Sequence, residues 1–161
     1  MSSWVLSTPR LRLRELTEAD RPLVARLDWL DADRVMRRCL DDYRRHGHSL
    51  WAAETVAGGE FVGLCGLLLQ DVEGQSELEV GYHLLPQYRG RGLATEAARG
   101  AMDFAFGRLG AARIISIILP DNDASMAVAG RNGLAFERAA RFCGVDVHIH
   151  AATAPSGRAA P

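Results

Sequence analysis

The chain lacks lysine altogether, so all 19 of its basic residues are arginine. A P-loop needs a lysine directly after its glycines, and that class of nucleotide site is therefore excluded. Excess charge of either sign is also missing, because 20 acidic residues leave a net charge of −1. We therefore expect no nucleic-acid partner and no anionic-membrane partner. No apolar run approaches the roughly 20 residues of a membrane helix, so we expect no membrane span.

Cysteine is scarce as well. Cys39, Cys65 and Cys143 are odd in number and widely spaced, which predicts neither a disulfide framework nor a metal site. Free thiols are typical of a reducing compartment. Residues 1–4 lack the basic and apolar regions of a secretory signal. We therefore expect a cytoplasmic protein without a bound metal.

The length and the end of the chain predict its organisation. At 161 residues the chain is long enough for one domain with a real hydrophobic core. The last residues are small and polar and include proline, which is typical of a disordered segment. We expect a single domain over residues 1–152 and a disordered tail over residues 153–161.

The periodicity of apolar residues predicts a mixed sheet with about seven strands and about four helices, an α/β (α+β) fold class. A strand, a helix and a second strand over residues 77–119 predict a right-handed crossover between parallel strands. Gly81 is expected to mark a bulge in the first of these strands. The predicted strands are residues 11–14, 49–55, 60–70, 77–84, 113–119, 135–142 and 145–151, and the predicted helices are about residues 17–30, 33–45, 94–109 and 123–132.

The most informative stretch, residues 86–96, follows a predicted strand and opens a predicted helix. Gly90 and Gly92 permit positive φ and leave no Cβ between the backbone and a ligand. A helix start offers unpaired N–H groups and a positive dipole end, so the stretch predicts a phosphate cradle. A dinucleotide fingerprint would need a third glycine where Thr95 stands. The remaining interpretation is a cradle for the pyrophosphate of coenzyme A.

The stretch resembles a motif of the GNAT superfamily of N-acetyltransferases, and the resemblance covers about residues 6–152. It is closest to the ribosomal-protein-alanine N-acetyltransferase-like branch, which acetylates protein N-termini. Several spaced motifs in the family's order are far more specific than one Gly-x-Gly. The matching segments are Glu79-Val80-Gly81-Tyr82, Gln87-x-x-Gly90-x-Gly92, Leu93-Ala94-Thr95-Glu96-Ala97, and Asn122-x-x-Ser125 followed by Gly133-Leu134.

The resemblance implies a V-splayed sheet with acetyl-CoA between the fourth and fifth predicted strands. It implies that main-chain N–H groups of the glycine stretch hold the pyrophosphate and that Leu84 and Leu85 pair with the pantetheine arm. Asn122 and Ser125 could instead be simple helix caps, which is the commonest use of these residues. The residues that the resemblance assigns to acetyl-CoA are Leu84, Leu85, Gln87, Tyr88, Arg89, Gly90, Arg91, Gly92, Leu93, Ala94, Thr95, Asn122 and Ser125.

The resemblance further implies direct transfer of an acetyl group to a primary amine in a ternary complex. Glu79 stands at the family's position for the base, which an ammonium acceptor requires. Glu77 and His83 stay alternatives, because they share a face with Glu79 on an unbroken strand. Ser125 is expected near the sulfur, and Ala129 stands where many relatives carry a tyrosine acid.

A second hypothesis is a coenzyme A-binding sensor or interaction module without turnover, which the absence of that tyrosine favours. The sequence does not name the amine acceptor, which is a protein N-terminus or a small molecule. His148 and His150 alternate on the last predicted strand and therefore point the same way. A homodimer through the last hairpin is left open.

Overall fold

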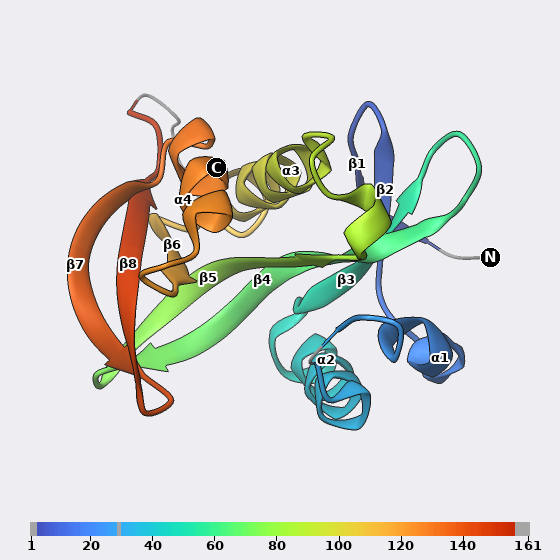
Figure 1. The fold of residues 1–161 in the computed structure, drawn as a ribbon, viewed down its shortest axis with the longest axis horizontal. Coiled ribbons are helices and arrows are strands. Elements are labelled where there is room, and N and C mark those ends of the chain that lie inside the picture. Colours follow the sequence, from blue (N-terminus) through green and yellow to red (C-terminus); the bar gives the residue numbers. More distant parts are fainter. Residues whose placement is uncertain (1–2, 29, 157–161) are drawn as a thin grey trace.

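The computed structural model describes residues 3–28 and 30–156, and a single mixed sheet of eight strands runs through it (Figure 1). The strands lie in the order β1-β2-β3-β4-β5-β6-β8-β7, and all neighbours are antiparallel except β5 and β6. The predicted mixed fold with four α-helices is confirmed. The strands are β1 (Trp4–Ser7), β2 (Leu11–Arg14), β3 (Leu50–Thr55), β4 (Phe61–Val72), β5 (Gln75–Leu84), β6 (Arg113–Ile118), β7 (Ala135–Phe142) and β8 (Val145–Thr153).

The helices lie on both faces of the sheet, with α3 and α4 on one side and α1 and α2 on the other (Figure 1). Two short 3-10 helices, η1 (Glu18–Asp20) and η2 (Pro86–Tyr88), precede α1 and α3. Three of the four predicted helices are found within one or two residues of their expected ends. The α-helices are α1 (Arg21–Val24), α2 (Ala32–His46), α3 (Leu93–Gly107) and α4 (Asp123–Arg131).

Three sequence predictions at the edges of the fold differ from the structure. Strand β1 was missed, because a four-residue segment at an edge carries too little pattern to detect. The helix predicted over residues 17–30 is only one turn, with a capping box of Thr17 and Asp20 before it and Pro22 in its first turn. Strand β8 extends through Thr153 into the predicted tail, and residues 157–161 lie outside the described residues.

A fourth difference matters for the site, because the bulge predicted at Gly81 is not formed. Strands β4 and β5 pair in unbroken register from Gly63 with Leu84 to Val72 with Gln75, and Gly81 lies opposite Gly66. The side-chain alternation of β5 is therefore continuous, so Glu77, Glu79 and His83 share one face.

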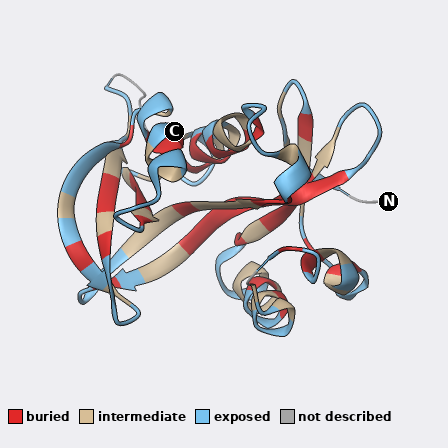
Figure 2. Ribbon diagram, viewed as in Figure 1, coloured by how far each residue is buried: buried red, intermediate tan, exposed pale blue. Residues whose placement is uncertain are grey.

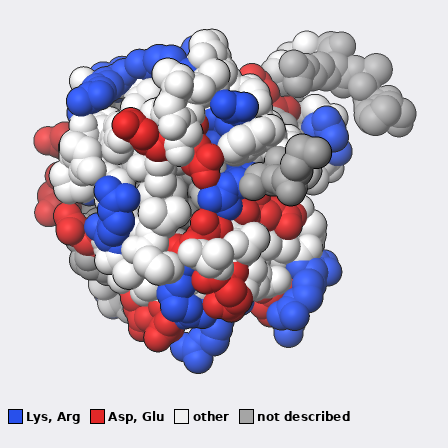
Figure 3. All heavy atoms as spheres, turned by 90° about the vertical axis from the view of Figure 1, so that its right-hand side faces the viewer, with Lys and Arg blue, Asp and Glu red and all other residues white. Residues whose placement is uncertain are grey.

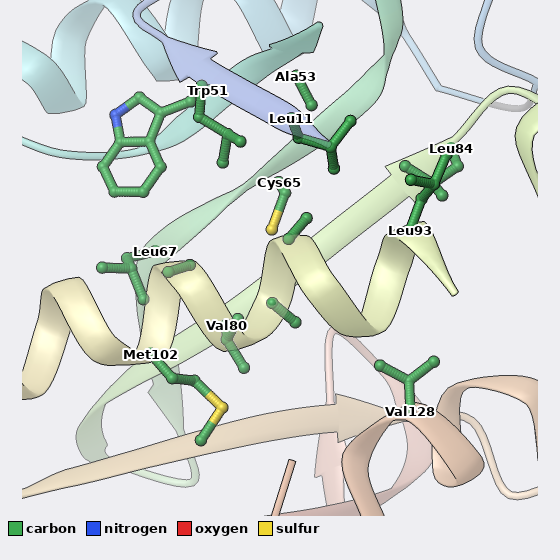
Figure 4. Close-up of a cluster of buried hydrophobic side chains, with 14 of the residues drawn as sticks. Leu11, Trp51, Ala53, Cys65, Leu67, Val80, Leu84, Leu93, Met102 and Val128 are labelled. Carbon is green, nitrogen blue, oxygen red and sulfur yellow. The ribbon is translucent and has the colours of Figure 1, made fainter. Parts of the chain in front are cut away.

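The main core lies between the sheet and α3, as the buried residues show (Figures 2 and 4). Ala97, Ala98, Ala101 and Ala105 are buried on α3, and their small side chains let the helix lie close to the strands. Trp51 of β3 is fully buried, and its ring packs edge-on against Phe104 at 5.3 Å between centroids. Each large apolar side chain that is fully buried here contributes about 1.5–3 kcal/mol to folding. This core fixes α3, and thereby the glycine stretch that precedes it.

An ion-pair network holds the start of α1 against the sheet. Arg14 of β2 donates to both carboxylate oxygens of Asp20, at 2.8 and 2.9 Å, and to Glu54 of β3 at 2.9 Å. Burial alone would raise the pKa of Asp20, but hydrogen bonds from Arg14 and from the Thr17 backbone outweigh it and lower that pKa. The network therefore stabilises the fold most when Asp20 is ionised.

Charged side chains of both signs lie close together on the face that carries the β1–β2 hairpin and α1 (Figure 3). Arg21, for example, pairs with Glu18 at 2.6 Å and also with Asp33. In the part of the chain that the structure describes, no helix is both long and apolar enough to cross a membrane.

Candidate functional site

The gap between β5 and β6 lies at the centre of the candidate site. These two parallel strands share one register pair, Glu79 with Ile115. Next to it, the Ser116 hydroxyl donates to the Val80 carbonyl at 3.4 Å. Strand β5 then continues to Leu84 and leads into the glycine stretch, while β6 turns toward α4. A parallel pair joined at one point leaves main-chain groups on both sides of the gap open to another extended chain.

The glycine stretch has the conformation of an anion cradle. Gly90 and Gly92 have φ of +75° and +78°, which other residues rarely adopt. Gly92 is the N-cap of α3, so the N–H groups of the first helical turn have no acceptor within the helix. A Cβ built on Gly90 would meet no atom within 4 Å, so the backbone surface there is open. The positive end of the α3 dipole therefore points at an accessible surface made of backbone N–H groups.

The turn between β1 and β2 contacts the glycine stretch and the first turn of α3 through hydrogen bonds. Glu96, in the first turn of α3, accepts hydrogen bonds from the Thr8 hydroxyl at 2.5 Å and from the Arg10 backbone at 2.9 Å. The Arg10 guanidinium donates to Glu96 at 2.7 Å and to the Arg91 carbonyl at 2.8 Å. Burial would raise the pKa of Glu96, but these bonds outweigh it and lower that pKa. Arg10 thus bridges the cradle and the helix that follows it, a contact that sequence reasoning missed.

The end of β5 is tied to the cradle by Arg89. The Arg89 guanidinium donates to the Leu84 carbonyl at 3.1 Å. The Leu85 N–H donates to Val62 at 2.9 Å, and the Leu85 carbonyl accepts from Tyr88 at 3.0 Å. Both main-chain groups of Leu85 therefore have partners within the protein. A rotation of the Arg89 side chain would free the Leu84 carbonyl. Of the two residues expected to pair with a pantetheine arm, Leu84 is therefore the one that can become available.

The other side chains of the glycine stretch differ in exposure, since Leu93 is buried in the main core and Tyr88 is half-buried. Gln87 is exposed, and the Tyr88 hydroxyl donates to Glu60 at 2.9 Å. The Arg91 guanidinium lies over the Tyr88 ring, 5.7 Å from its centroid. Gln87 and Arg91 are therefore at the surface, and the backbone around the two glycines is the part available to a ligand.

Glu79 is the carboxylate at the join of the two strands. It accepts a hydrogen bond from the Gln70 amide at 3.0 Å and another from the backbone N–H of Ile117. Burial raises the pKa of Glu79 above its ordinary value, and these bonds together with the charge of Arg38 only partly offset the effect. A half-buried carboxylate with a raised pKa is a candidate for a group that exchanges protons in a reaction.

The two alternatives to Glu79 differ in their surroundings. Glu77 accepts from Arg113 at 3.0 Å, and the same guanidinium holds Glu137 with two bonds, so Glu77 belongs to a structural ion-pair cluster. Burial lowers the pKa of His83, and a hydrogen bond with the Asp28 backbone acts in the opposite direction. His83 is therefore mainly neutral near pH 7 and retains a capacity to accept a proton.

On the far side of the gap, α4 presents Asn122 and Ser125. The Asn122 side chain accepts from the Ser125 N–H at 3.1 Å, so Asn122 caps α4. Tyr82 of β5 reaches across, and its hydroxyl donates to the Ser125 carbonyl at 3.3 Å. Burial raises the pKa of Tyr82, so the phenol is protonated near neutral pH. Ala129, which stands where the family resemblance implies a tyrosine, is buried.

Tyr82 is thus a site residue that sequence reasoning missed, although it lay within a quoted motif. The signal available in the sequence was strand alternation. It places Tyr82 on the opposite face of the strand from Glu79, because the two positions are three residues apart. His148 and His150 do point the same way, as predicted, since both rings pack edge-on against Phe136. They lie on β8, which is separated from β5 by β6.

The glycine stretch and the edge of β5 offer groups that a coenzyme A molecule would use, whereas Leu85 has no free main-chain group for its arm. The cradle offers backbone donors and a helix dipole to a pyrophosphate, and the gap beside β5 offers an edge to an extended arm. The glycine stretch follows the end of β5 at Leu84, and Glu79 lies near the middle of that strand. A ligand bound along this strand would therefore have its phosphates at the glycines and its reactive end near the carboxylate.

Comparisons with known proteins identify a matching family and a matching fold. Residues 10–135 match the family model described as "Acetyltransferase (GNAT) domain". The chain is 32% identical over 151 residues to "Uncharacterized protein YkkB" of Bacillus subtilis (strain 168), covering 84% of this chain and 88% of that one.

Two solved structures describe the same fold. The acetyltransferase from Agrobacterium tumefaciens has a TM-score of 0.80 at 28% identity and covers 94% of this chain and 95% of its own. RimL, a ribosomal alpha-N-protein acetyltransferase solved in complex with coenzyme A, has a TM-score of 0.70 at 20% identity, covering 94% and 98%. At that identity the likeness to RimL concerns the fold alone.

Proposed function

Because the chain belongs to the GNAT acetyltransferase family, we propose that it moves the acetyl group of acetyl-CoA to a primary amine by direct transfer in a ternary complex. The observation that carries the proposal is the position of Glu79. Its half-buried carboxylate lies where β5 and β6 join, on the strand that leads into the glycine stretch. A proton acceptor and an anion cradle on one strand are what acetyl transfer from a coenzyme A thioester to an amine requires.

The glycine stretch would hold the cofactor. Backbone N–H groups of residues 90–94 would bind the pyrophosphate, since those of Tyr88 and Arg89 already donate within the protein. The Leu84 carbonyl would bind the pantetheine arm. Arg10 would keep the cradle in shape through Glu96 and the Arg91 carbonyl. Acetyl-CoA, once bound, supplies an activated acetyl thioester.

Glu79 would remove a proton from the acceptor. Amines titrate at about 8 for an α-amino group and about 10.4 for a lysine side chain, so most acceptor molecules are ammonium ions at pH 7. An ammonium ion has no lone pair and cannot attack a thioester. A carboxylate whose pKa is raised by burial is a better base than one in water, because its pKa lies closer to that of the amine.

The α4 side of the gap would assist the departing thiolate. Ser125 carries a hydroxyl, and Tyr82 holds a protonated phenol against the Ser125 carbonyl. Either hydroxyl could donate a hydrogen bond to a sulfur anion nearby. This pair would replace the tyrosine that relatives carry at the position of Ala129.

The test is a thiol-release assay with acetyl-CoA over a panel of amines, including peptides with free N-termini, amino acids, polyamines and aminoglycosides. Glu79→Gln should lower kcat about 10²–10⁴-fold at low pH, where the amine is protonated, and less at high pH. Glu15→Gln is the matched control, because Glu15 is exposed and far from the gap in the sheet order. An unchanged pH–rate profile in Glu79→Gln would remove this residue from the mechanism and direct attention to His83.

A second candidate function is a coenzyme A-binding sensor or interaction module without turnover. Ala129 favours it, since the buried alanine provides no acid for the thiolate. In this case calorimetry would detect binding of acetyl-CoA, but no amine in the panel would release thiol.

A further inference from the structure

We propose that Gln70 and Arg38 form a relay that orients the Glu79 carboxylate and keeps it in its ionised form, which makes them positioning residues for the reaction. The inference rests on the proposed function of Glu79 as the base. It adds two residues from β4 and α2 that no motif of the sequence singled out.

Gln70 contacts Glu79 directly. In the β4–β5 register Gln70 lies opposite Glu77, so Glu79 is its diagonal neighbour on the same face. The Gln70 Nε2 donates to Glu79 Oε1 at 3.0 Å. A hydrogen bond to the charged form of a carboxylate favours that form, and the deprotonated carboxylate is the form a general base needs.

Arg38 fixes which end of the Gln70 amide faces Glu79. Arg38 Nη2 donates to Gln70 Oε1 at 3.1 Å and to the Leu69 carbonyl at 2.8 Å. The guanidinium has no acceptor atom, so it selects the oxygen end of the amide. The nitrogen end must then point at Glu79. Without Arg38 the amide could turn over and present its oxygen, which would favour a protonated carboxyl.

Arg38 is itself held from α2. Its Nε donates to Asp42 Oδ2 at 3.3 Å, and the buried Ser49 donates to the same oxygen at 3.1 Å. The relay therefore runs from Asp42 through Arg38 and Gln70 to Glu79. It links the helix that covers this face of the sheet to the strand that carries the base.

The other groups around Glu79 do not duplicate the relay. From β6 the Ile117 backbone N–H donates to the carboxylate, and this donor cannot titrate. From β5, Glu77 and His83 share its face, with Glu77 already paired to Arg113. Tyr82 lies on the opposite face of β5 and is protonated near pH 7. Arg38 is the one cation whose charge acts on Glu79 among the described residues.

Loss of the relay should therefore raise the pKa of Glu79. Gln70→Met keeps the length of the side chain but removes donor and acceptor, and Arg38→Gln removes the cation. Each should shift the acid limb of the kcat profile upward by about one pH unit, which is about a tenfold loss of kcat below the limb. On the alkaline plateau kcat should recover, because Glu79 is ionised there. Arg38→Lys keeps the charge but loses the planar guanidinium with its several donors. The shift of the acid limb should therefore be smaller in this variant than in Arg38→Gln.

Arg37→Gln is the matched control. It removes the same charge from the neighbouring position of α2, where the side chain is exposed. Its kcat profile should keep the wild-type limb. The Arg38 side chain is 42% exposed, so Arg38→Gln should fold even if Gln70→Met does not, which thermal unfolding of each variant would verify.

A second readout separates this inference from the proposed function. Carbon-13 NMR titration of the glutamate carboxyls in the free protein, with the Glu79 signal assigned by its loss in Glu79→Gln, reports the ionisation without any substrate. An upward shift of the Glu79 titration in Gln70→Met and Arg38→Gln, but not in Arg37→Gln, supports the relay even if no amine is acetylated. Unshifted titrations in both relay variants would overturn it, even in an enzyme whose activity depends on Glu79.

Discussion

Gly90→Ala should weaken acetyl-CoA binding far more than it weakens the fold. Gly90 has φ of +75°, and a Cβ added there would meet no atom within 4 Å. The folded protein therefore has room for the methyl group, and the only cost to stability is the left-handed backbone. A bound pyrophosphate would lie against the same backbone surface, where the methyl group would stand between them.

The expected magnitudes follow from these two effects. An alanine in the left-handed region costs about 1–2 kcal/mol. For a domain of this size, that lowers Tm by about 2–8 °C. Loss of one hydrogen bond to a charged phosphate costs about 1.5–3 kcal/mol. At about 1.4 kcal/mol for each factor of ten, the Kd for acetyl-CoA should rise about 10–100-fold.

Gly47→Ala provides the matched control. Gly47 caps α2 with φ of +79°, and a Cβ there also meets no atom within 4 Å. The backbone strain should thus be the same in both variants, whereas Gly47 belongs to no part of the candidate site. Calorimetry with acetyl-CoA and thermal unfolding of both proteins would separate strain from binding. Equal affinity in Gly90→Ala and wild type, with equal losses of Tm in both variants, would refute the assignment of the cradle.

Two further predictions concern the supports of the site and of the fold. Arg10→Met should raise the KM for acetyl-CoA about 5–20-fold with kcat nearly unchanged, because it removes charge-assisted bonds to Glu96 and to the Arg91 carbonyl; Arg141→Met, which breaks a surface pair with Asp146, should change neither constant. A KM in Arg10→Met equal to that of wild type would mean that the glycine stretch keeps its conformation without Arg10. Asp20→Asn should cost about 1.5–3 kcal/mol in urea unfolding at pH 7. Since the folded state lowers the pKa of Asp20, its contribution is present above the ordinary range of an aspartate and is lost as the pH falls through the lowered value. The variant should therefore lose less stability than wild type on acidification, and parallel curves for the two proteins would contradict this account.

The local elements of this protein could be predicted from its sequence. The alanine stripe of α3, the glycines before it and the β-branched run of β6 are patterns within short segments. Helix and strand periodicity depends on bonds between near neighbours, so a single segment contains the signal. The failures fall where the signal is weak or overridden, as in the four-residue β1 and the single turn of α1. Gly81 was read as a bulge, but the register of ten consecutive pairs with β4 decided otherwise.

The sequence by itself determined the class of fold, the family resemblance and the glycine cradle. Tertiary structure alone decided what surrounds Glu79, because Gln70 and Arg38 are 32 residues apart and come together only when α2 packs on the sheet. Arg10 likewise reaches Glu96 across 86 residues of chain, through the position of the β1–β2 turn beside α3. Long-range contacts of this kind depend on strand order and register, which no local pattern encodes. For this reason the glycine stretch could be found in the sequence, while its contact with Arg10 and the hydrogen bonds from Arg38 through Gln70 to Glu79 could not.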